Sequence, residues 1–364
     1  MGNWGKCRAP LEATLFGGAM RGQPCQWHRP APISLRSIRA TALAFLCAVM
    51  MLRPAVAADA DCRELEQNYA QVKSGITSIQ RNAMLFASAA KDCGGLARRL
   101  IAAGASLQAR DRTGAMPLAH AARGGHAPLV ARFLADGAAI DARDLNGATA
   151  LYAAAEAERP STVATLLARG ADSNLTGRSD VSPLAAAAFR GNDRIVELLL
   201  SHGAEPDHVD ATGKTPLIYA AARGFALVVR RLIDAGADAA ASHGNDLTAL
   251  MWAAGHEDGV GAAAAVAVVE LLMEHGAAID AVDNRGRTAL MFAADRGDAA
   301  VVETLVNRGA ERALRDKTGK TACDLAADES VRAKLAPSLL SSACGTEKGA
   351  SDAATIPPDT RRAP

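Results

Sequence analysis

Large apolar residues recur along most of the chain at a fixed spacing of 33 residues. Six leucines fall in one column at this period: Leu85, Leu118, Leu151, Leu184, Leu217 and Leu250. Glycine–alanine pairs keep the same period and begin at Gly104, Gly137, Gly170, Gly203 and Gly236. After Leu250 the step becomes 40, which places Leu290 in the column, and a further 33 leads to Cys323. A period of this length predicts an array of stacked units, because one unit cannot bury its own apolar face.

The unit that begins at residue 210 shows the elements that each repeat predicts. Its opening, "DATGKTPL", predicts a turn that begins at Asp210 and takes its positive φ at Gly213. A short helix follows from Pro216, and its alanines allow close packing against neighbouring helices. A second helix precedes Gly236, which ends it in the left-handed conformation. The inward-facing residues expected on this second helix are Leu227, Val228, Leu232 and Ile233.

Over roughly residues 78–335 the repeats closely resemble ankyrin repeats. The stretches that carry the resemblance are "GAMPLAHAARGGH", "GATALYAAAE", "VSPLAAAAFRGN", "GKTPLIYAAARG", "LTALMWAAGH" and "GRTALMFAADRGD". The resemblance implies an all-α ankyrin-repeat solenoid of helix-turn-helix units with β-turn fingers, about seven repeats plus a C-terminal cap. It also implies a concave face made by the fingers and the first helices, and a binding surface that carries no chemistry of its own.

The expected units start near residues 78, 111, 144, 177, 210, 243, 283 and 316. A capping helix is expected within residues 58–77, and residues 336–364 have the composition of a disordered tail. The third and fifth turns depart from the pattern, since Gly177 and His243 stand where other turns have aspartate, which predicts looser turns. A seven-residue insertion around "GHEDGVGAA" in the unit that starts at 243 is expected to bulge from the surface.

Residues 1–57 read as an N-terminal extension followed by a Sec-type signal peptide. The h-region, "ATALAFLCAVMML" at residues 40–52, is apolar except for Thr41, follows basic residues, and precedes a small-residue site. Cleavage is expected after Ala57. The predicted location is therefore periplasmic or secreted, with no membrane contact after cleavage. Removing residues 1–57 takes away seven basic residues and one acidic residue, which leaves the remaining chain acidic.

Four cysteines follow the predicted cleavage site, an even count that permits disulfides in an exported chain. Pairing within each end of the array gives Cys62–Cys93 and Cys323–Cys344, and each bridge would tie down a cap. Four free thiols are the alternative, with Cys323 a small core residue.

Motifs for catalysis or cofactor binding are absent from the sequence. The two "GKT" triplets lack the upstream glycine of a phosphate loop, since His208 and Leu314 hold that position. There is no HExxH, GxSxG or CxxC, and the histidines are scattered, with His126 and His256 expected to be solvated. The sequence therefore predicts no enzyme activity, no cofactor and no metal site. Catalysis is kept only as a remote alternative.

A basic surface is predicted on the concave side of the array. Turn tips and first-helix ends hold Arg112, Arg123, Arg143, Arg178, Arg190, Lys214, Arg223, Arg285, Arg287, Arg296, Arg315, Lys317 and Lys320. These thirteen outnumber the seven acidic residues of the same columns, whereas Glu197, Glu270, Glu274 and Glu303 lie on second helices. Basic charge on a concave surface steers acidic partners, so the predicted partner is an acidic protein. Nucleic acid is not expected, because export would remove the chain from it, and the chain is expected to be a monomer.

Two alternatives to this interpretation stay open. The array could be a regulatory or stabilising subunit of one periplasmic enzyme, or the basic face could be solvated without a partner. The aromatic residues Tyr219, Trp252 and Phe292 share one column, two residues after the repeated leucine. They are expected to pack in the core rather than to form a binding stripe.

Overall fold

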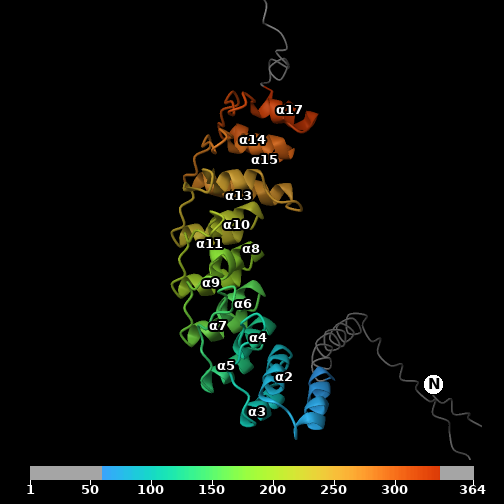
Figure 1. Cartoon of the computed structure of the whole chain (residues 1–364). Coiled ribbons are helices and arrows are strands. Elements are labelled where there is room, and N and C mark those ends of the chain that lie inside the picture. The colour runs from blue at the N-terminus through green and yellow to red at the C-terminus, as the bar shows by residue number, and fades with distance from the viewer. Residues whose placement is uncertain (1–59, 337–364) are drawn as a thin grey trace, which may run out of the picture. The chain divides into compact units, whose positions relative to one another are not determined.

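The computed structural model describes residues 60–336. Helix pairs follow one another along this range (Figure 1). Their bounds are α2 Ser78–Ala90 and α3 Gly94–Ala102, α4 Pro117–Gly124 and α5 Ala127–Ala135, α6 Ala150–Glu156 and α7 Pro160–Ala168, α8 Pro183–Arg190 and α9 Asp193–Ser201, α10 Pro216–Ala222 and α11 Ala226–Asp234, α12 Ala249–Ala254 and α13 Ala262–Glu274, α14 Ala289–Arg296 and α15 Ala299–Asn307, and α16 Ala322–Leu325 and α17 Glu329–Leu335. The array of stacked units predicted from the 33-residue period is confirmed, and so is the helical solenoid that the resemblance implies.

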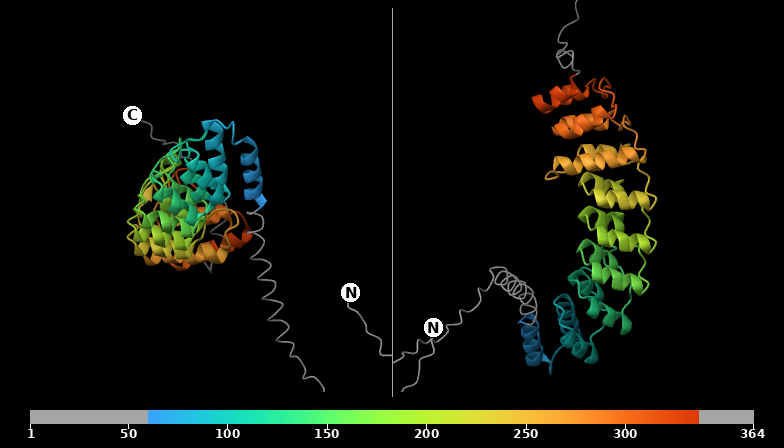
Figure 2. Two further views of the ribbon diagram at one scale, coloured as in Figure 1. Left: turned by 90° about the horizontal axis from the view of Figure 1, so that it is seen from below. Right: turned by 180° about the vertical axis from the view of Figure 1, so that it is seen from behind.

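The first helices of successive pairs pack on one another, and so do the second helices (Figure 2). The repeated leucines lie between these two layers and are at most 2 % exposed. Alanines at zero exposure, such as Ala154 and Ala221, let the short helices approach closely. One continuous cluster of buried residues therefore runs from Leu85 to Leu335.

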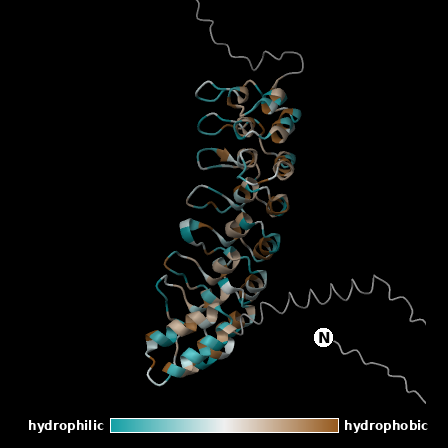
Figure 3. Ribbon diagram, turned by 90° about the vertical axis from the view of Figure 1, so that its right-hand side faces the viewer, coloured by the Kyte–Doolittle hydropathy of each residue, from teal (hydrophilic) through white to brown (hydrophobic). Residues whose placement is uncertain are grey.

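Polar turns, here called fingers, join each pair to the next and project to one side of the helices (Figure 3). In the finger that starts at Asp210, the carboxylate accepts the backbone N–H groups of Thr212 and Lys214 at 2.8 and 3.0 Å. Asp111, Asp144, Asp283 and Asp316 make the same two bonds in their own fingers. The fingers also bond to one another, as Ala211 N donates to Ser179 O at 2.9 Å.

The two irregular fingers are closed without an aspartate. Gly177 N donates to Val181 O at 2.9 Å around η1 (Arg178–Asp180). The other finger is a small hairpin of β1 (Ser242–His243) and β2 (Leu247–Thr248). Both fingers therefore keep a closed backbone, although each lacks the two aspartate bonds of the regular fingers. Non-glycine residues in these two fingers, including Ser179 and Asn245, adopt a positive φ. This backbone conformation costs free energy for any residue with a Cβ atom.

The predicted inner face of α11 needs correction. Val228, Val229 and Leu232 are its buried residues, whereas Leu227 is 71 % exposed. Ile233 is only half-buried. Positions 228, 229 and 232 form an i, i+1, i+4 set that fits one side of a 3.6-residue helix, and Leu227 lies beyond that side.

Part of the insertion extends a helix rather than bulging from the surface. α13 has 13 residues, whereas α11 and α15 have nine each. The remaining residues form a loop that packs on the preceding unit, where Glu257 N donates to Ala222 O at 2.9 Å. Only part of the segment, including Asp258 with a side chain 98 % exposed, protrudes into solvent.

At the N-terminal end, residues 60–72 are helical and are bonded covalently to the array. The predicted pair Cys62–Cys93 forms a disulfide, and Cys93 is the residue before α3. Arg99 and Glu66 add an ion pair of 2.6 Å between the same two segments.

Several expectations fall partly or wholly outside the described residues. Cys323 takes part in a disulfide, but its predicted partner, Cys344, is not among them. The signal peptide and the C-terminal tail are not among them either. Within residues 60–336, no helix has the length and apolar character needed to cross a membrane.

Candidate functional site

The finger face is the surface formed by the fingers and the adjoining sides and ends of the first helices. All thirteen basic residues predicted for the binding surface lie in or beside fingers, or at the ends of first helices. Three of them, Lys214, Arg223 and Arg287, are half-buried, and the other ten are exposed. The prediction placed these residues on the finger face, but their surroundings divide them into two groups.

Toward the C-terminal end, several of these cations are already paired. Arg223 lies 3.6 Å from Glu257, and Arg296 lies 2.8 Å from Asp258. Arg287 contacts Asp295 at 3.1 Å, and Arg285 contacts Asp283 at 3.0 Å. Glu257 and Asp258 belong to the insertion, and the count of seven acidic residues omitted them. The insertion lies between the two helices of its unit, where a segment can fold over the ends of first helices. This place in the sequence is the signal from which these two acidic partners could have been predicted.

Toward the N-terminal end, Arg123 and Arg178 line one hollow of about 440 Å³ together with the finger residues Asp144 and Asn146. Arg190 lies on a second hollow that shares Tyr152 and Glu156 with the first. Within residues 60–336, none of these three arginines has an ion-pair partner, although Arg190 lies 5.9 Å from the ring centroid of Phe189. The available positive charge of the finger face therefore includes this cluster of three.

The acidic residues of the second helices are paired within their own layer. Glu197 lies 2.7 Å from Arg194, Glu270 lies 3.7 Å from Arg308, and Glu303 lies 2.8 Å from Lys334. These pairs are exposed, so each contributes little stability. Their position on the second helices separates this acidic charge from the finger face.

The aromatic column is not part of the buried core, which corrects the expectation from the sequence. Tyr219, Trp252 and Phe292 are each half-buried. The Lys214 ammonium lies 4.6 Å from the ring centroid of Trp252 and 5.4 Å from that of Tyr219. Arg285 lies 5.6 Å from the ring centroid of Phe292. The rings therefore rest on the core and turn one side toward the basic residues of the finger face.

His256 is buried rather than solvated, with 6 % of its surface exposed. Its Nε2 lies 3.0 Å from Asp298 Oδ2, and its Nδ1 lies 3.1 Å from the carbonyl oxygen of Glu257. These contacts join the insertion to the cap of α15, which begins after Asp298. His126 also makes a contact between units, with Nε2 2.9 Å from Ala90 O. Both histidines therefore have structural partners that the sequence period does not reveal.

The Tyr219 hydroxyl donates a hydrogen bond to Asp210 Oδ2. Burial and this bond to a carboxylate raise the pKa of Tyr219 to about 12. Burial acts to raise the pKa of Asp210, but bonds from Tyr219, Lys214 and Thr212 outweigh it and leave that pKa below its usual value. The pair links the finger to the first helix of the same unit.

Replacing Asp210 by asparagine is expected to lower the pKa of Tyr219 from about 12 toward its ordinary value of 10, because the ring loses a negatively charged acceptor. The folded pKa is raised, so this tyrosine stabilises the fold fully below pH 10 and loses that contribution as pH rises through 12. Ultraviolet absorbance after rapid pH jumps measures the titration of the three tyrosines. Asp316→Asn, which makes the same change in the equivalent turn of another finger, where the aspartate bonds no tyrosine, serves as the control. An unchanged midpoint in Asp210→Asn contradicts the assignment.

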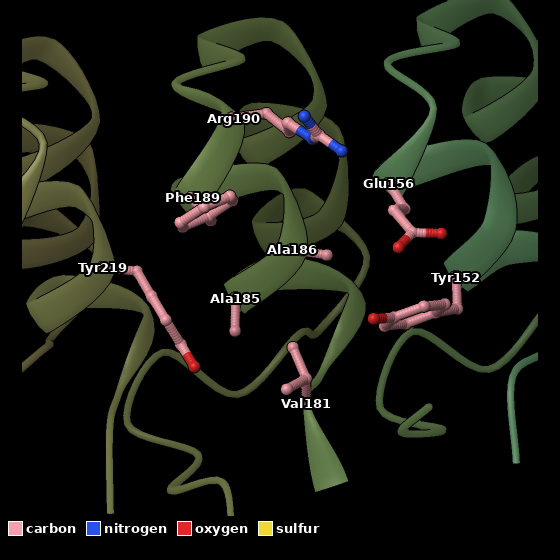
Figure 4. Close-up of a pocket in the computed structure, with 8 residues that line it drawn as sticks. All are labelled: Tyr152, Glu156, Val181, Ala185, Ala186, Phe189, Arg190 and Tyr219. Carbon is pink, nitrogen blue, oxygen red and sulfur yellow. The ribbon is translucent and has the colours of Figure 1, made fainter. Parts of the chain in front are cut away.

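A pocket of about 270 Å³ opens on the finger face between α6, α8 and α10 (Figure 4). Ala185, Ala186 and Val181 form its floor, Tyr152 stands on one side, and Phe189 and Tyr219 stand on the other. Glu156 and Arg190 lie at its rim. The Phe189 and Tyr219 rings meet edge to face, with centroids 5.8 Å apart. The sequence did not predict this pocket.

No group of three histidine, cysteine or acidic side chains is arranged to hold a metal ion among residues 60–336. The glycines of the two "GKT" triplets, Gly213 and Gly319, lie in finger turns at φ of 78° and 83°. The arrangement of exposed arginines and rings is suited to binding.

Comparison with known proteins identifies one family. The family model described as ankyrin repeats (3 copies) matches residues 84–177, 184–262 and 260–352. Among solved structures, the chain is similar to the crystal structure of the human ASB11 ankyrin repeat domain, with 26 % sequence identity and a TM-score of 0.55. That match covers 61 % of this chain and 96 % of the other. A search of the curated proteins gives no match.

Proposed function

Because the chain belongs to the ankyrin repeat family, whose arrays are generally protein–protein interaction modules without catalytic chemistry, we propose that it binds an acidic partner protein through its finger face. The observation that carries the proposal is the cluster of Arg123, Arg178 and Arg190. The three side chains line adjoining hollows and have no acidic partner among the described residues. Positive charge gathered around a hollow attracts acidic surfaces and steers their approach.

The proposed location is the periplasm or the extracellular space, with the chain processed after Ala57. The signal-like pattern at residues 40–52 supports this location. The Cys62–Cys93 disulfide supports it independently, since such bonds persist in oxidising compartments. The processed chain is proposed to act as a monomer. It would contain seven ankyrin units, of which α2/α3 is the first, and α16/α17 would be the C-terminal cap.

Capture of a partner by immobilised residues 58–364 from periplasmic extract tests the proposal. The variant Arg123→Glu/Arg178→Glu/Arg190→Glu is expected to reduce capture at least tenfold at low salt and to weaken its salt dependence. The matched control reverses three exposed arginines of the second-helix layer, Arg98, Arg169 and Arg230, and is expected to capture like the original chain. Equal capture by both triple variants would show that the finger face is not the binding surface.

A regulatory or stabilising subunit of one periplasmic enzyme is the alternative form of the same binding function. Here the captured protein would be an enzyme whose activity or lifetime changes when the array is added. Assay of the captured protein with and without the chain separates a regulator from a passive scaffold.

A further inference from the structure

The pocket between α6, α8 and α10 lies where one column of side chains changes from alanine, at Ala153 and Ala186, to aromatic residues. Two residues after the repeated leucine, successive units carry Tyr219, Trp252 and Phe292. The preceding unit has Ala186 at this position, and Ala186 lies on the pocket floor with 7 % of its surface exposed. The space that a large side chain would fill there is left open between Tyr152 and the Phe189–Tyr219 pair.

The irregular finger at Gly177 makes room for one wall of this pocket. A Cβ atom at Gly177 would lie 2.9 Å from Cε2 of Tyr152, closer than Cβ atoms approach other atoms in real structures. An aspartate like those of the other fingers therefore cannot stand at this position while Tyr152 keeps its place. The Tyr152 ring can therefore occupy its place only because the finger has glycine instead of aspartate at residue 177.

The charge around the pocket favours the binding of an acidic segment. Arg190 lies at the rim, and the adjoining hollow brings Arg123 and Arg178 to the same side, against the acidic Glu156 and Asp144. Burial and Glu156 raise the pKa of Tyr152, while Arg123 and Arg190 act against them, so these charges act on the same ring. On the opposite wall, the Lys214 ammonium lies 5.4 Å from the ring centroid of Tyr219.

We propose that this pocket receives one large apolar side chain, aromatic or aliphatic, from an acidic segment of the partner protein. The inference rests on the proposed function and deepens it by identifying the anchor of the interaction. A volume of about 270 Å³ lies just below the roughly 300–1,000 Å³ of small-molecule sites and suits a single side chain. Tyrosine and arginine around a central pocket are the residue types in which binding energy concentrates at protein interfaces.

Fluorescein-labelled heptapeptides provide the probe. Three peptides carry phenylalanine, tryptophan or leucine at the centre and acidic residues at every other position, and a fourth carries a central alanine. Fluorescence anisotropy with the purified chain is expected to give saturable binding for at least one of the first three. The central alanine is expected to weaken binding at least tenfold, and lysine flanks are expected to abolish it. The inference is overturned if none of the three binds below about 1 mM, or if the alanine peptide binds equally well.

Substitutions in the protein itself test the same inference by filling the pocket. Ala186→Leu adds apolar atoms to the pocket floor and is expected to weaken the binding of the apolar-centred peptide at least tenfold. The matched control, Ala267→Leu, adds the same atoms to an exposed position of α13 and is expected to leave binding unchanged. A second variant, Phe189→Ala, removes one wall and is expected to act in the same direction. Thermal unfolding of each variant confirms that it is folded under the binding conditions.

The outcomes separate this inference from the proposed function. If Ala186→Leu and Phe189→Ala bind the peptides and the captured partner as the original chain does, while reversal of Arg123, Arg178 and Arg190 abolishes capture, the finger face binds but the pocket is not the anchor. If the arginine reversal also leaves capture intact, both statements fail. Loss of partner binding in Ala186→Leu, with Ala267→Leu unaffected, supports both.

Discussion

Replacement of Leu217 by alanine is expected to lower the free energy of unfolding by about 2–5 kcal/mol. Leu217 lies in the repeated leucine column between the two helix layers and is 2 % exposed. Its removal leaves a cavity that helices held on both sides by neighbouring units cannot close by moving together. Among single substitutions in the array, a change of this kind is expected to have one of the largest effects.

Leu227→Ala is the matched control, because it makes the same chemical change in the same unit at a residue 71 % exposed. Its expected effect stays within about 0.5 kcal/mol. Urea unfolding followed by circular dichroism measures both variants, with the midpoint shift interpreted at constant m-value. Equal losses in the two variants would contradict the placement of α11 and the account of the core.

The second large effect is expected from the disulfide at the N-terminal end. The double variant Cys62→Ala/Cys93→Ala is expected to lose about 3–4 kcal/mol, because the bridge spans 31 residues and limits the freedom of the unfolded chain. The helix at residues 60–72 should then separate first, because the bridge ties it to the start of α3.

Arg99→Ala controls for the non-covalent contact between the same segments. Its exposed ion pair with Glu66 is worth at most about 1 kcal/mol. Urea unfolding gives the global loss, and proteolysis within residues 60–77 reports the local one. An intact N-terminal helix and an unchanged midpoint in the cysteine double variant would show that the bridge does not hold this end of the array.

The period of the sequence was sufficient to predict the stacked helix pairs. Apolar residues that recur every 33 positions can be buried only by packing against the equivalent residues of the neighbouring units. It also placed the basic residues in fingers and at first-helix ends. However, the period does not predict which non-repeating residues contact a repeated position. The burial of His256 and the pairing of Arg223 with Glu257 depend on an insertion that has no counterpart in other units.

The pocket depends on two departures from the repeat pattern. The sequence predicts a looser turn at Gly177, but the missing side chain of this glycine makes room for the ring of Tyr152. Ala186 leaves a pocket open because its side chain is small and Tyr219 stands at the same position in the next unit. Each of these features depends on two residues about 25 to 33 positions apart, and neither residue is informative alone.

The arginines of the finger face that have ion-pair partners differ as test sites from those that have none. Reversal of Arg287 or Arg296 would break existing ion pairs as well as alter the surface potential. Arg123, Arg178 and Arg190 have no such partners among residues 60–336, so their reversal changes the surface with little effect on the fold.

Hydrogen exchange of the chain with and without its captured partner tests most directly the claim that the finger face is the binding surface. We expect slower exchange in residues 117–124, 144–156, 177–190 and 210–219, which contain the three arginines and the fingers and first helices around them. Exchange in α7, α9 and α11 should change little. Protection confined to those second helices, with the fingers exchanging as in the free chain, would contradict the account.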